Sequence, residues 1–208
     1  MELHPVTSAQ PASVLFELPS LIERVDLTRL FLRPQPLEVE LGSGDGTFLV
    51  GLARQRPEHN FIGVERLLGR LRKLERKTQR ARLNNLRGVR IESSYFLRYL
   101  LPLRSVAALH IYFPDPWPKR KHRRHRLVNE GFPALARLVL APGGSVFLRT
   151  DDEDYFRQMN EVFSANRLFR PVETPQPLAA LATDFEQDFQ ARGIQTFQAA
   201  FRTANESE

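Results

Sequence analysis

A glycine-rich turn with an acid just before it is the first feature of this sequence that could bind a small molecule. The turn, Gly42-Ser43-Gly44-Asp45-Gly46, follows the apolar segment LEVEL and precedes a segment with helical periodicity. Glycines there permit a tight turn and close approach of a ligand to the backbone, so Gly42 and Gly44 are candidate contacts. Glu40 ends the expected strand. A carboxylate there is costly to bury without a partner and suits a cationic ligand, such as the amino group and sulfonium of S-adenosylmethionine.

A second acid, Glu65, stands at the end of the next expected strand, NFIGV (60–64), about 20 residues beyond the glycines. At this spacing a carboxylate can accept hydrogen bonds from both hydroxyls of a ribose. The alternative is that Glu65 is only an acid at a helix N-terminus, stabilised by the helix dipole. The turn and the spacing together predict a nucleoside-binding site of the Rossmann type. After the third strand, the candidates for a contact near the adenine are Glu92 and Ser93.

A proline-rich loop, FPDPWP, joins a further carboxylate to a strongly basic run. Its prolines restrict the backbone, so Asp115 is presented on a stiff element. Trp117 could stack on a base or fill the loop, and we assign it no role. Residues 119–126, KRKHRRHR, contain six Lys or Arg and no acid. A cofactor pocket beside such a phosphate-binding strip predicts chemistry on a nucleic acid.

Basic residues also gather at positions 66–82, which hold eight Lys or Arg and one Glu. The net charge of the chain is +6, so the sequence outside these two basic segments is acidic. Clustering of this kind favours a polyanionic partner. For residues 66–82, a solvated helix face is an equal alternative.

The elements that position these residues alternate between strand and helix. The pattern predicts an α/β, Rossmann-like fold with a mainly parallel central sheet and helices on both faces. We expect strands at 37–41, 60–64, 88–91, 105–113 and 145–150, and helices at 65–83, 94–102, 127–140 and 153–165. We interpret residues 1–36 as an N-terminal arm with a short helix near 19–32, residues 37–202 as a single domain, and residues 203–208 as a flexible tail.

Composition excludes several protein classes. The 208 residues include no cysteine, so disulfides and thiolate metal sites are excluded. No apolar run approaches the ~18–20 residues of a membrane-spanning helix. The first residues show no basic segment followed by an apolar core, so no signal peptide is expected. We therefore expect a cytoplasmic protein with no membrane and no metal partner.

Several segments together resemble the bacterial tRNA (guanine-N7)-methyltransferase family, whose members are class I S-adenosylmethionine-dependent methyltransferases. They are ELGSGDG, FIGVE, FPDPWPK with the basic cluster after it, RTDDEDY at 149–155, and Thr183-Asp184-Phe185-Glu186. The resemblance covers roughly residues 37–202. The FPDPW segment with its basic run is specific, whereas the glycine turn occurs in any related methyltransferase. Related sequences often have Gly-Asp where this chain has Glu92-Ser93, so the alignment assigns the adenine contact to Ser93, with Glu92 as the alternative.

The resemblance implies S-adenosylmethionine as the methyl donor and a guanine in the variable loop of tRNA as the acceptor, a tRNA-processing reaction. By position, Glu40 and Glu65 match cofactor carboxylates, and Asp115 matches a cofactor contact and the catalytic residue. The implied substrate-binding residues are Lys119, Asp151, Thr183, Asp184, Phe185 and Glu186. The implied RNA contacts are Lys121, His122, Arg123, Arg124, His125 and Arg126.

For two of these sites a purely structural role is an equal alternative. Asp151 and Asp152 precede a helical segment and could cap it. Thr183 and Glu186 stand three residues apart and could form a capping box.

Guanine N7 carries a lone pair and no proton, so methyl transfer to it needs no base. We expect direct in-line transfer in which the protein mainly positions the reactants. Carboxylates could select guanine by accepting hydrogen bonds from its N1–H and exocyclic amine, and the candidates are Asp115, Asp151 and Glu186.

Three other functions compete with this one. The PDPW segment partly resembles the loop of N-methyltransferases that act on amino groups of other RNAs or proteins. A non-catalytic RNA-binding protein on a Rossmann core would keep the basic run. A dinucleotide dehydrogenase is disfavoured by Glu40, which would repel a pyrophosphate. The sequence leaves the oligomeric state, monomer or homodimer, open.

Overall fold

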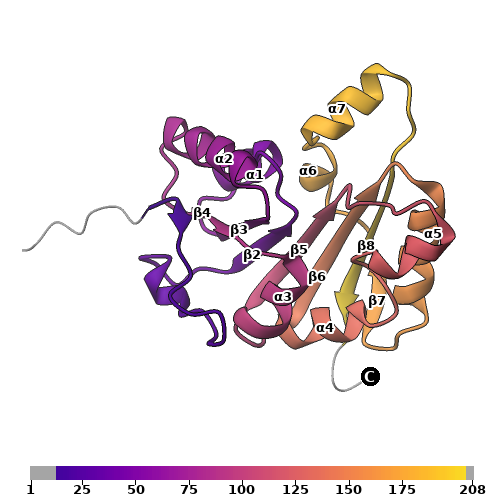
Figure 1. The fold of residues 1–208 in the computed structure, drawn as a ribbon, viewed down its shortest axis with the longest axis horizontal. Coiled ribbons are helices and arrows are strands. Elements are labelled where there is room, and N and C mark those ends of the chain that lie inside the picture. Colours follow the sequence, from indigo (N-terminus) through magenta and orange to yellow (C-terminus); the bar gives the residue numbers. More distant parts are fainter. Residues whose placement is uncertain (1–12, 205–208) are drawn as a thin grey trace, which may run out of the picture.

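The computed structural model describes residues 13–204, which form one eight-stranded sheet covered by helices on both faces (Figure 1). The strands follow the order β1-β4-β3-β2-β5-β6-β8-β7. All neighbouring strands are parallel except β8, which runs antiparallel to β6 and β7. The strands are β1 (Leu15–Phe16), β2 (Leu37–Leu41), β3 (Asn60–Glu65), β4 (Leu86–Arg90), β5 (Val106–Tyr112), β6 (Leu140–Thr150), β7 (Phe169–Val172) and β8 (Phe197–Thr203).

The helices connect successive strands, as the parallel pairing requires. They are η1 (Leu27–Arg29), α1 (Thr47–Gln55), α2 (Leu68–Arg80), α3 (Ser93–Tyr95), η2 (Phe96–Leu100), η3 (Arg120–His125), α4 (Phe132–Val139), α5 (Glu153–Ser164), α6 (Gln176–Ala179) and α7 (Asp184–Ala191). The predicted α/β, Rossmann-like fold is confirmed. None of the helices in residues 13–204 is long and apolar enough to span a membrane.

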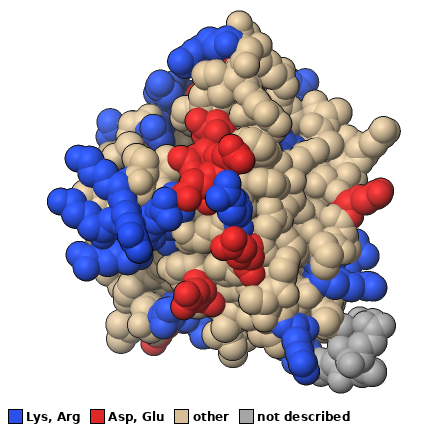
Figure 2. All heavy atoms as spheres, turned by 90° about the vertical axis from the view of Figure 1, so that its right-hand side faces the viewer, with Lys and Arg blue, Asp and Glu red and all other residues tan. Residues whose placement is uncertain are grey.

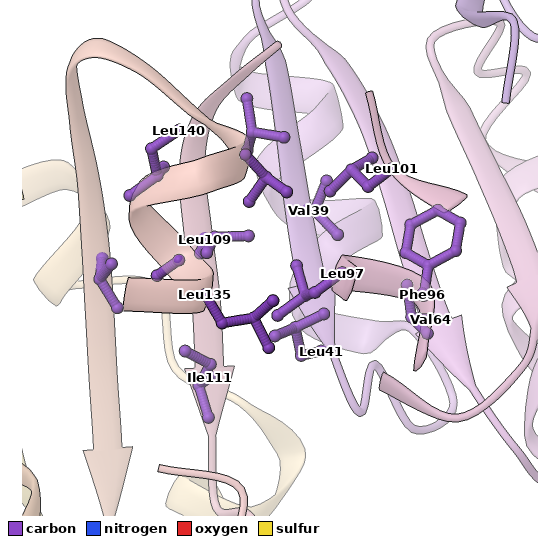
Figure 3. Close-up of a cluster of buried hydrophobic side chains, with 14 of the residues drawn as sticks. Val39, Leu41, Val64, Phe96, Leu97, Leu101, Leu109, Ile111, Leu135 and Leu140 are labelled. Carbon is purple, nitrogen blue, oxygen red and sulfur yellow. The ribbon is translucent and has the colours of Figure 1, made fainter. Parts of the chain in front are cut away.

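The two faces of the central strands carry different kinds of side chain. On β2 and β5, Val39, Leu41, Leu109 and Ile111 point to one side and pack with residues of η2 and α4 in the larger core (Figure 3). Because side chains alternate along a strand, the residues between them point to the other side, toward α1. Those residues are Glu38, Glu40, Ala108, His110 and Tyr112. The sheet therefore places its polar side chains on the α1 side.

The segment before β2 packs onto this sheet. Residues Leu15 and Phe16 pair with β4, and the Val25 amide donates to the carbonyl of Leu100 at 2.7 Å. Val25, Leu30 and Phe31 are buried in the larger core. Of the helix expected near 19–32, only the 3-10 turn η1 is present, which Asp26 caps. Residues 1–12 and 205–208, parts of the expected arm and tail, lie outside the described residues.

Helix α4 is shorter than its periodicity predicts. The apolar spacing predicts a helix over 127–140, but α4 begins at Phe132. Asn129 closes a turn by accepting from the Gly131 amide at 3.0 Å, and Pro133 occupies the first helical turn, where proline is tolerated. At the other end, β6 begins at Leu140 and includes Pro142 and the two following glycines, with an irregularity in its pairing with β5.

Candidate active site

The glycine turn lies at the carboxyl end of β2, where the strand order reverses between β3 and β5. The amides of Gly42 and Ser43 donate to the Val64 carbonyl at 2.8 and 3.0 Å, which fixes the turn to β3. Gly42 and Gly44 have φ values of 81° and 55°, which favour glycine. A Cβ on either residue would meet no atom within 4 Å, so the space above the turn is open.

A cavity of about 220 Å³ occupies this space. Four parts of the chain line it: the end of β2 with the glycine turn and the start of α1, the first turns of α2, the end of β5, and the start of α7. The lining residues are Glu40, Gly42, Ser43, Gly44, Asp45, Thr47, Phe48, Arg70, Lys73, Tyr112, Phe113, Thr183, Asp184 and Phe185. Segments far apart in the sequence thus converge at the predicted edge of the sheet.

Glu40 is the buried acid of this cavity. It is 4% exposed, and its Oε2 atom has no hydrogen-bond partner among the described residues. Burial raises the pKa of Glu40 to about 8, although the nearby Arg149 guanidinium acts in the opposite direction. The Ser43 hydroxyl is buried and also lacks a partner within the described chain. Buried polar atoms normally have partners, so these two mark a place where a polar ligand would complete the structure.

Asp45 joins the glycine turn to two helices. Its carboxylate accepts from Lys77 Nζ of α2 at 2.7 Å and from the Thr47 hydroxyl at 3.0 Å. The Thr47 hydroxyl also lies 2.7 Å from Asp184 Oδ2, at the start of α7. Burial acts to raise the pKa of Asp45, but the hydrogen bonds from Lys77 and Thr47 outweigh it and lower the pKa. Asp45 therefore stays ionised and holds the rim of the cavity together.

Glu65, at the end of β3, and Glu92, after β4, are not among the residues that line the cavity. Glu65 is buried at the end of β3, and its Oε1 accepts from the Leu67 amide at 2.8 Å. Glu65 is thus an acid at the N-terminus of the following helix, as the alternative interpretation holds. The Arg70 guanidinium lies 3.6 Å from Glu65 Oε2. Glu92 caps α3 through both carboxylate oxygens, which accept from the amides of residues 94 and 95. Ser93 lies half-buried in the first turn of α3.

The proline-rich loop begins and ends in strained backbone. Phe113 and Trp117 have φ values of 50° and 43°, a region that costs free energy for residues other than glycine. The Pro116 carbonyl accepts from Arg126 Nε at 2.6 Å, which holds the loop in place. Asp115 is exposed on this loop, beyond Tyr112 and Phe113, which reach the cavity.

The Trp117 ring packs partly against the basic run. Its centroid lies 5.9 Å from that of His122 and 5.2 Å from that of His125. Trp117 is still 38% exposed, so part of this residue remains open to solvent.

The basic run at 119–126 is mostly exposed but contains one buried residue. Lys119, Lys121 and Arg124 are exposed. Figure 2 shows one face of the molecule, on which Lys and Arg side chains gather beside Asp and Glu side chains. Arg123 is also exposed and pairs with Asp154 at 2.9 Å.

Arg126 is 1% exposed, so the structure corrects its expected role as an RNA contact. Its guanidinium donates to Gln158 and Asp154 at 2.7 and 2.8 Å and lies 4.6 Å from the centre of the Tyr155 ring. The charge of Arg126 thus serves the interior, because each nitrogen of its guanidinium already donates a hydrogen bond within this chain.

Both segments that could cap a helix, Asp151-Asp152 and Thr183 to Glu186, do so in the structure. Asp152 caps α5 by accepting from the Tyr155 amide at 2.7 Å, while Asp151 is exposed beside it. Thr183 and Glu186 form a capping box at the start of α7.

Glu186 Oε2 also accepts from Arg149 at 2.6 Å, so this carboxylate is part of a buried ion pair. The box and the ion pair position Asp184 and Phe185 at the cavity. The Phe185 ring is 51% exposed there, with its centroid 6.1 Å from that of Phe113.

Sequence reasoning missed a buried polar chain below the cavity. His110 is fully buried; its Nε2 lies 2.7 Å from Glu38 Oε2 and its Nδ1 lies 2.9 Å from the Tyr112 hydroxyl. Arg56 donates to Glu38 at 2.8 Å. Burial acts to raise the pKa of Glu38, but the hydrogen bond from His110 and the charges of His110 and Arg56 lower it to about 2. Alternation along β2 and β5 could have revealed this pairing, since it puts Glu38 and His110 on one face.

In sequence, the chain is similar to known methyltransferases. Residues 34–199 match the family described as "Putative methyltransferase". A tRNA (guanine-N(7)-)-methyltransferase of Sodalis glossinidius is 35% identical over 81% of this chain and 73% of its own length. A protein of the same name from Thermotoga maritima is 33% identical over 83% of this chain. Several curated relatives are longer, and this chain spans 56% to 65% of three of them.

Solved structures show the same fold. A crystal structure of the 16S rRNA methyltransferase KamB has a TM-score of 0.61 at 18% identity, covering 88% of this chain and 95% of that one. This match supports the class I methyltransferase fold. The match to the family model and the identity to curated relatives show that the chain belongs to the tRNA (guanine-N7)-methyltransferase family.

Proposed function

We propose that this protein transfers a methyl group from S-adenosylmethionine to N7 of a guanine in the variable loop of tRNA, in the cytoplasm. The observation that carries the proposal is the pair of unpartnered buried polar atoms, Glu40 Oε2 and Ser43 Oγ, beside an open glycine turn. They lie in a cavity formed where the class I methyltransferase fold reverses its strand order. Membership of the family supports the same acceptor and the same donor.

The residues present fit S-adenosylmethionine. Glu40 would bind the cationic amino group, and the backbone of Gly42 and Gly44 allows close approach. Glu65 would accept from the ribose hydroxyls, and Ser93 or Glu92 would lie toward the adenine. When bound, the cofactor supplies a methyl group on an electron-poor sulfonium sulfur.

The side chains of this protein have to position the guanine and keep the site dry. Phe113 and Phe185 offer aromatic faces at the cavity, against which a purine can stack. Asp115 and Asp151 are exposed acids at the carboxyl ends of β5 and β6, where either can accept from guanine N1–H and its exocyclic amine. A carboxylate there also stabilises the positive charge that arrives on the purine ring. Lys119 and the exposed part of the basic run would hold backbone phosphates.

The decisive experiment is methyl transfer from labelled S-adenosylmethionine to an unmodified tRNA transcript. Borohydride reduction and aniline scission then cut the product wherever N7-methylguanine is present. We expect label in the tRNA and a cut in the variable loop. Label without a cut would mean methylation of another atom, such as an amino group. Binding of both ligands without label would favour a non-catalytic RNA-binding protein.

The same assay separates chemistry from RNA binding at Asp115. Asp115→Ala is expected to abolish methyl transfer and to leave tRNA affinity within a factor of about two, because this exposed acid lies beside the cavity and contributes no positive charge. Asp188→Ala, an exposed acid near the end of α7, is the matched control. Transfer by Asp115→Ala at the rate of the control would remove Asp115 from the mechanism.

A further inference from the structure

The outer face of α2 is strongly basic, and the proposed function does not account for it. The helix buries Leu71, Leu74 and Thr78 on one side. The opposite side is exposed to solvent. Its exposed basic residues are Arg70, Arg72, Lys73, Arg76 and Arg80, with Arg66 and Arg82 exposed just beyond the two ends.

Acids of the described chain compensate only part of the positive charge on this helix. Lys77 pairs with Asp45 at 2.7 Å, and Arg70 lies 3.6 Å from Glu65. Among residues 13–204, no acid forms an ion pair with Arg72, Arg76 or Arg80. Like charges at a spacing of four residues repel one another along a helix. A helix that retains them on one face is therefore suited to a polyanion.

The basic face is continuous with the cavity. Arg70 and Lys73, from the first two turns of α2, line the cavity themselves. Helix α2 follows β3, while the basic run at 119–126 follows β5, and β2 with its glycine turn lies between these strands. A nucleic acid that delivers a base to the cavity thus meets positive charge on both sides of it.

We propose that the face formed by Arg72, Arg76 and Arg80 is a second binding surface for the RNA substrate and contacts its backbone phosphates. This inference rests on the proposed function and adds the path of the RNA to it. Successive residues of the three are four apart, which is about 6 Å along a helix, so one strand can bring several phosphates to the row. Contacts of this kind fix the position of the RNA and do not read its sequence.

The test is the triple variant Arg72→Gln, Arg76→Gln, Arg80→Gln, with tRNA affinity measured over a range of salt concentrations. We expect affinity to fall at least tenfold near physiological salt. The slope of log affinity against log salt should lose about 2 to 3 units, because each lost phosphate contact removes about 0.7 to 0.9. Binding of S-adenosylmethionine should stay unchanged, which shows that the variant is folded.

A matched control removes the same total charge elsewhere. The variant Arg29→Gln, Arg33→Gln, Arg167→Gln alters exposed residues away from α2 and should keep the wild-type slope within about half a unit. An α2 variant with the slope of this control would overturn the proposal and leave a solvated helix face. Unchanged tRNA binding with lost binding to vesicles of acidic phospholipid would overturn it in favour of a lipid surface. If the unsubstituted protein neither binds nor methylates tRNA, the proposed function itself fails, and this inference with it.

Discussion

We expect Glu40 to couple the binding of a cationic ligand to the release of a proton. In the ligand-free protein its pKa is about 8, so the carboxyl is protonated at neutral pH. A cationic ligand group beside it favours the ionised form, because opposite charges attract strongly in a buried site. Binding should therefore release up to one proton below pH 8, and the affinity for S-adenosylmethionine should rise with pH toward that value. Titration calorimetry in buffers of different ionisation enthalpy measures the protons released.

The variant Glu40→Gln tests the same residue through stability. The unfolded carboxyl ionises near its ordinary pKa of 4.5, whereas the folded one holds its proton up to about pH 8. Raising the pH between these values therefore destabilises the ligand-free protein. Gln removes that loss, so the melting temperature of the variant should exceed that of the wild type at pH 8, by more than at pH 5, while cofactor affinity falls. Equal pH dependence in both proteins would contradict the raised pKa.

For single residues, the sequence indicates which side chains could do chemistry better than it indicates whether each one is buried or reaches the cavity. The glycine spacing predicts the turn at the end of β2, where Glu40 lines the cavity, because such a turn depends on short-range geometry. It misses Tyr112, Arg70 and Lys73, which reach the cavity from other elements. The sequence also groups Arg126 with its basic neighbours. Arg126 is buried because it donates to Asp154 and Gln158 of α5, and nothing within the basic run predicts those contacts.

At the scale of elements, Glu38 connects three segments. It lies on β2, contacts His110 of β5, and accepts from Arg56 just after α1. Its folded pKa of about 2 is below the unfolded value of 4.5, so its stabilising effect is complete above pH 4.5 and is lost as the pH falls toward 2. Glu38→Gln should lower the free energy of unfolding at pH 7 by about 3 kcal/mol, because it leaves buried partners unpaired.

Urea unfolding from pH 7 to pH 2.5 checks this prediction. The wild type should lose stability in the acid range, and the variant should lose less. Glu58→Gln, an exposed acid in the same connection, is the control and should behave as the wild type. If Glu38→Gln keeps the full acid dependence, other carboxylates are responsible for it.

The sequence predicts the order of the elements, but their ends depend on tertiary contacts. The strands at 37–41, 60–64 and 105–113 are found within about a residue because short apolar runs are strong local signals. The helix expected near 19–32 is reduced to η1 because Val25, Leu30 and Phe31 are anchored in the core separately. Such anchoring satisfies the apolar side chains without helical periodicity, and no local pattern reveals it.

At the scale of the whole molecule, the basic run should combine two separable roles. The double variant Lys121→Gln, Arg124→Gln should reduce the salt dependence of tRNA binding by about 1 to 2 slope units with little change in melting temperature, since both residues are exposed. Arg126→Gln should do the opposite. It should lower the melting temperature, because Asp154 and Gln158 lose their buried partner, and keep the wild-type slope. A reduced slope in Arg126→Gln at unchanged stability would return this residue to the RNA surface.

The outer strands of the sheet bear on how the protein behaves at high concentration. An exposed sheet edge is a template on which a second chain can add a strand, the route to fibrous aggregates. Here one edge ends in β1, which has two residues, and the other in β7, where Pro171 lacks an amide proton and Arg170 adds charge. Within residues 13–204, neither edge offers a long row of free donors and acceptors. The fold thus protects its most apolar strands, which lie in the middle, from adding a second molecule edge to edge.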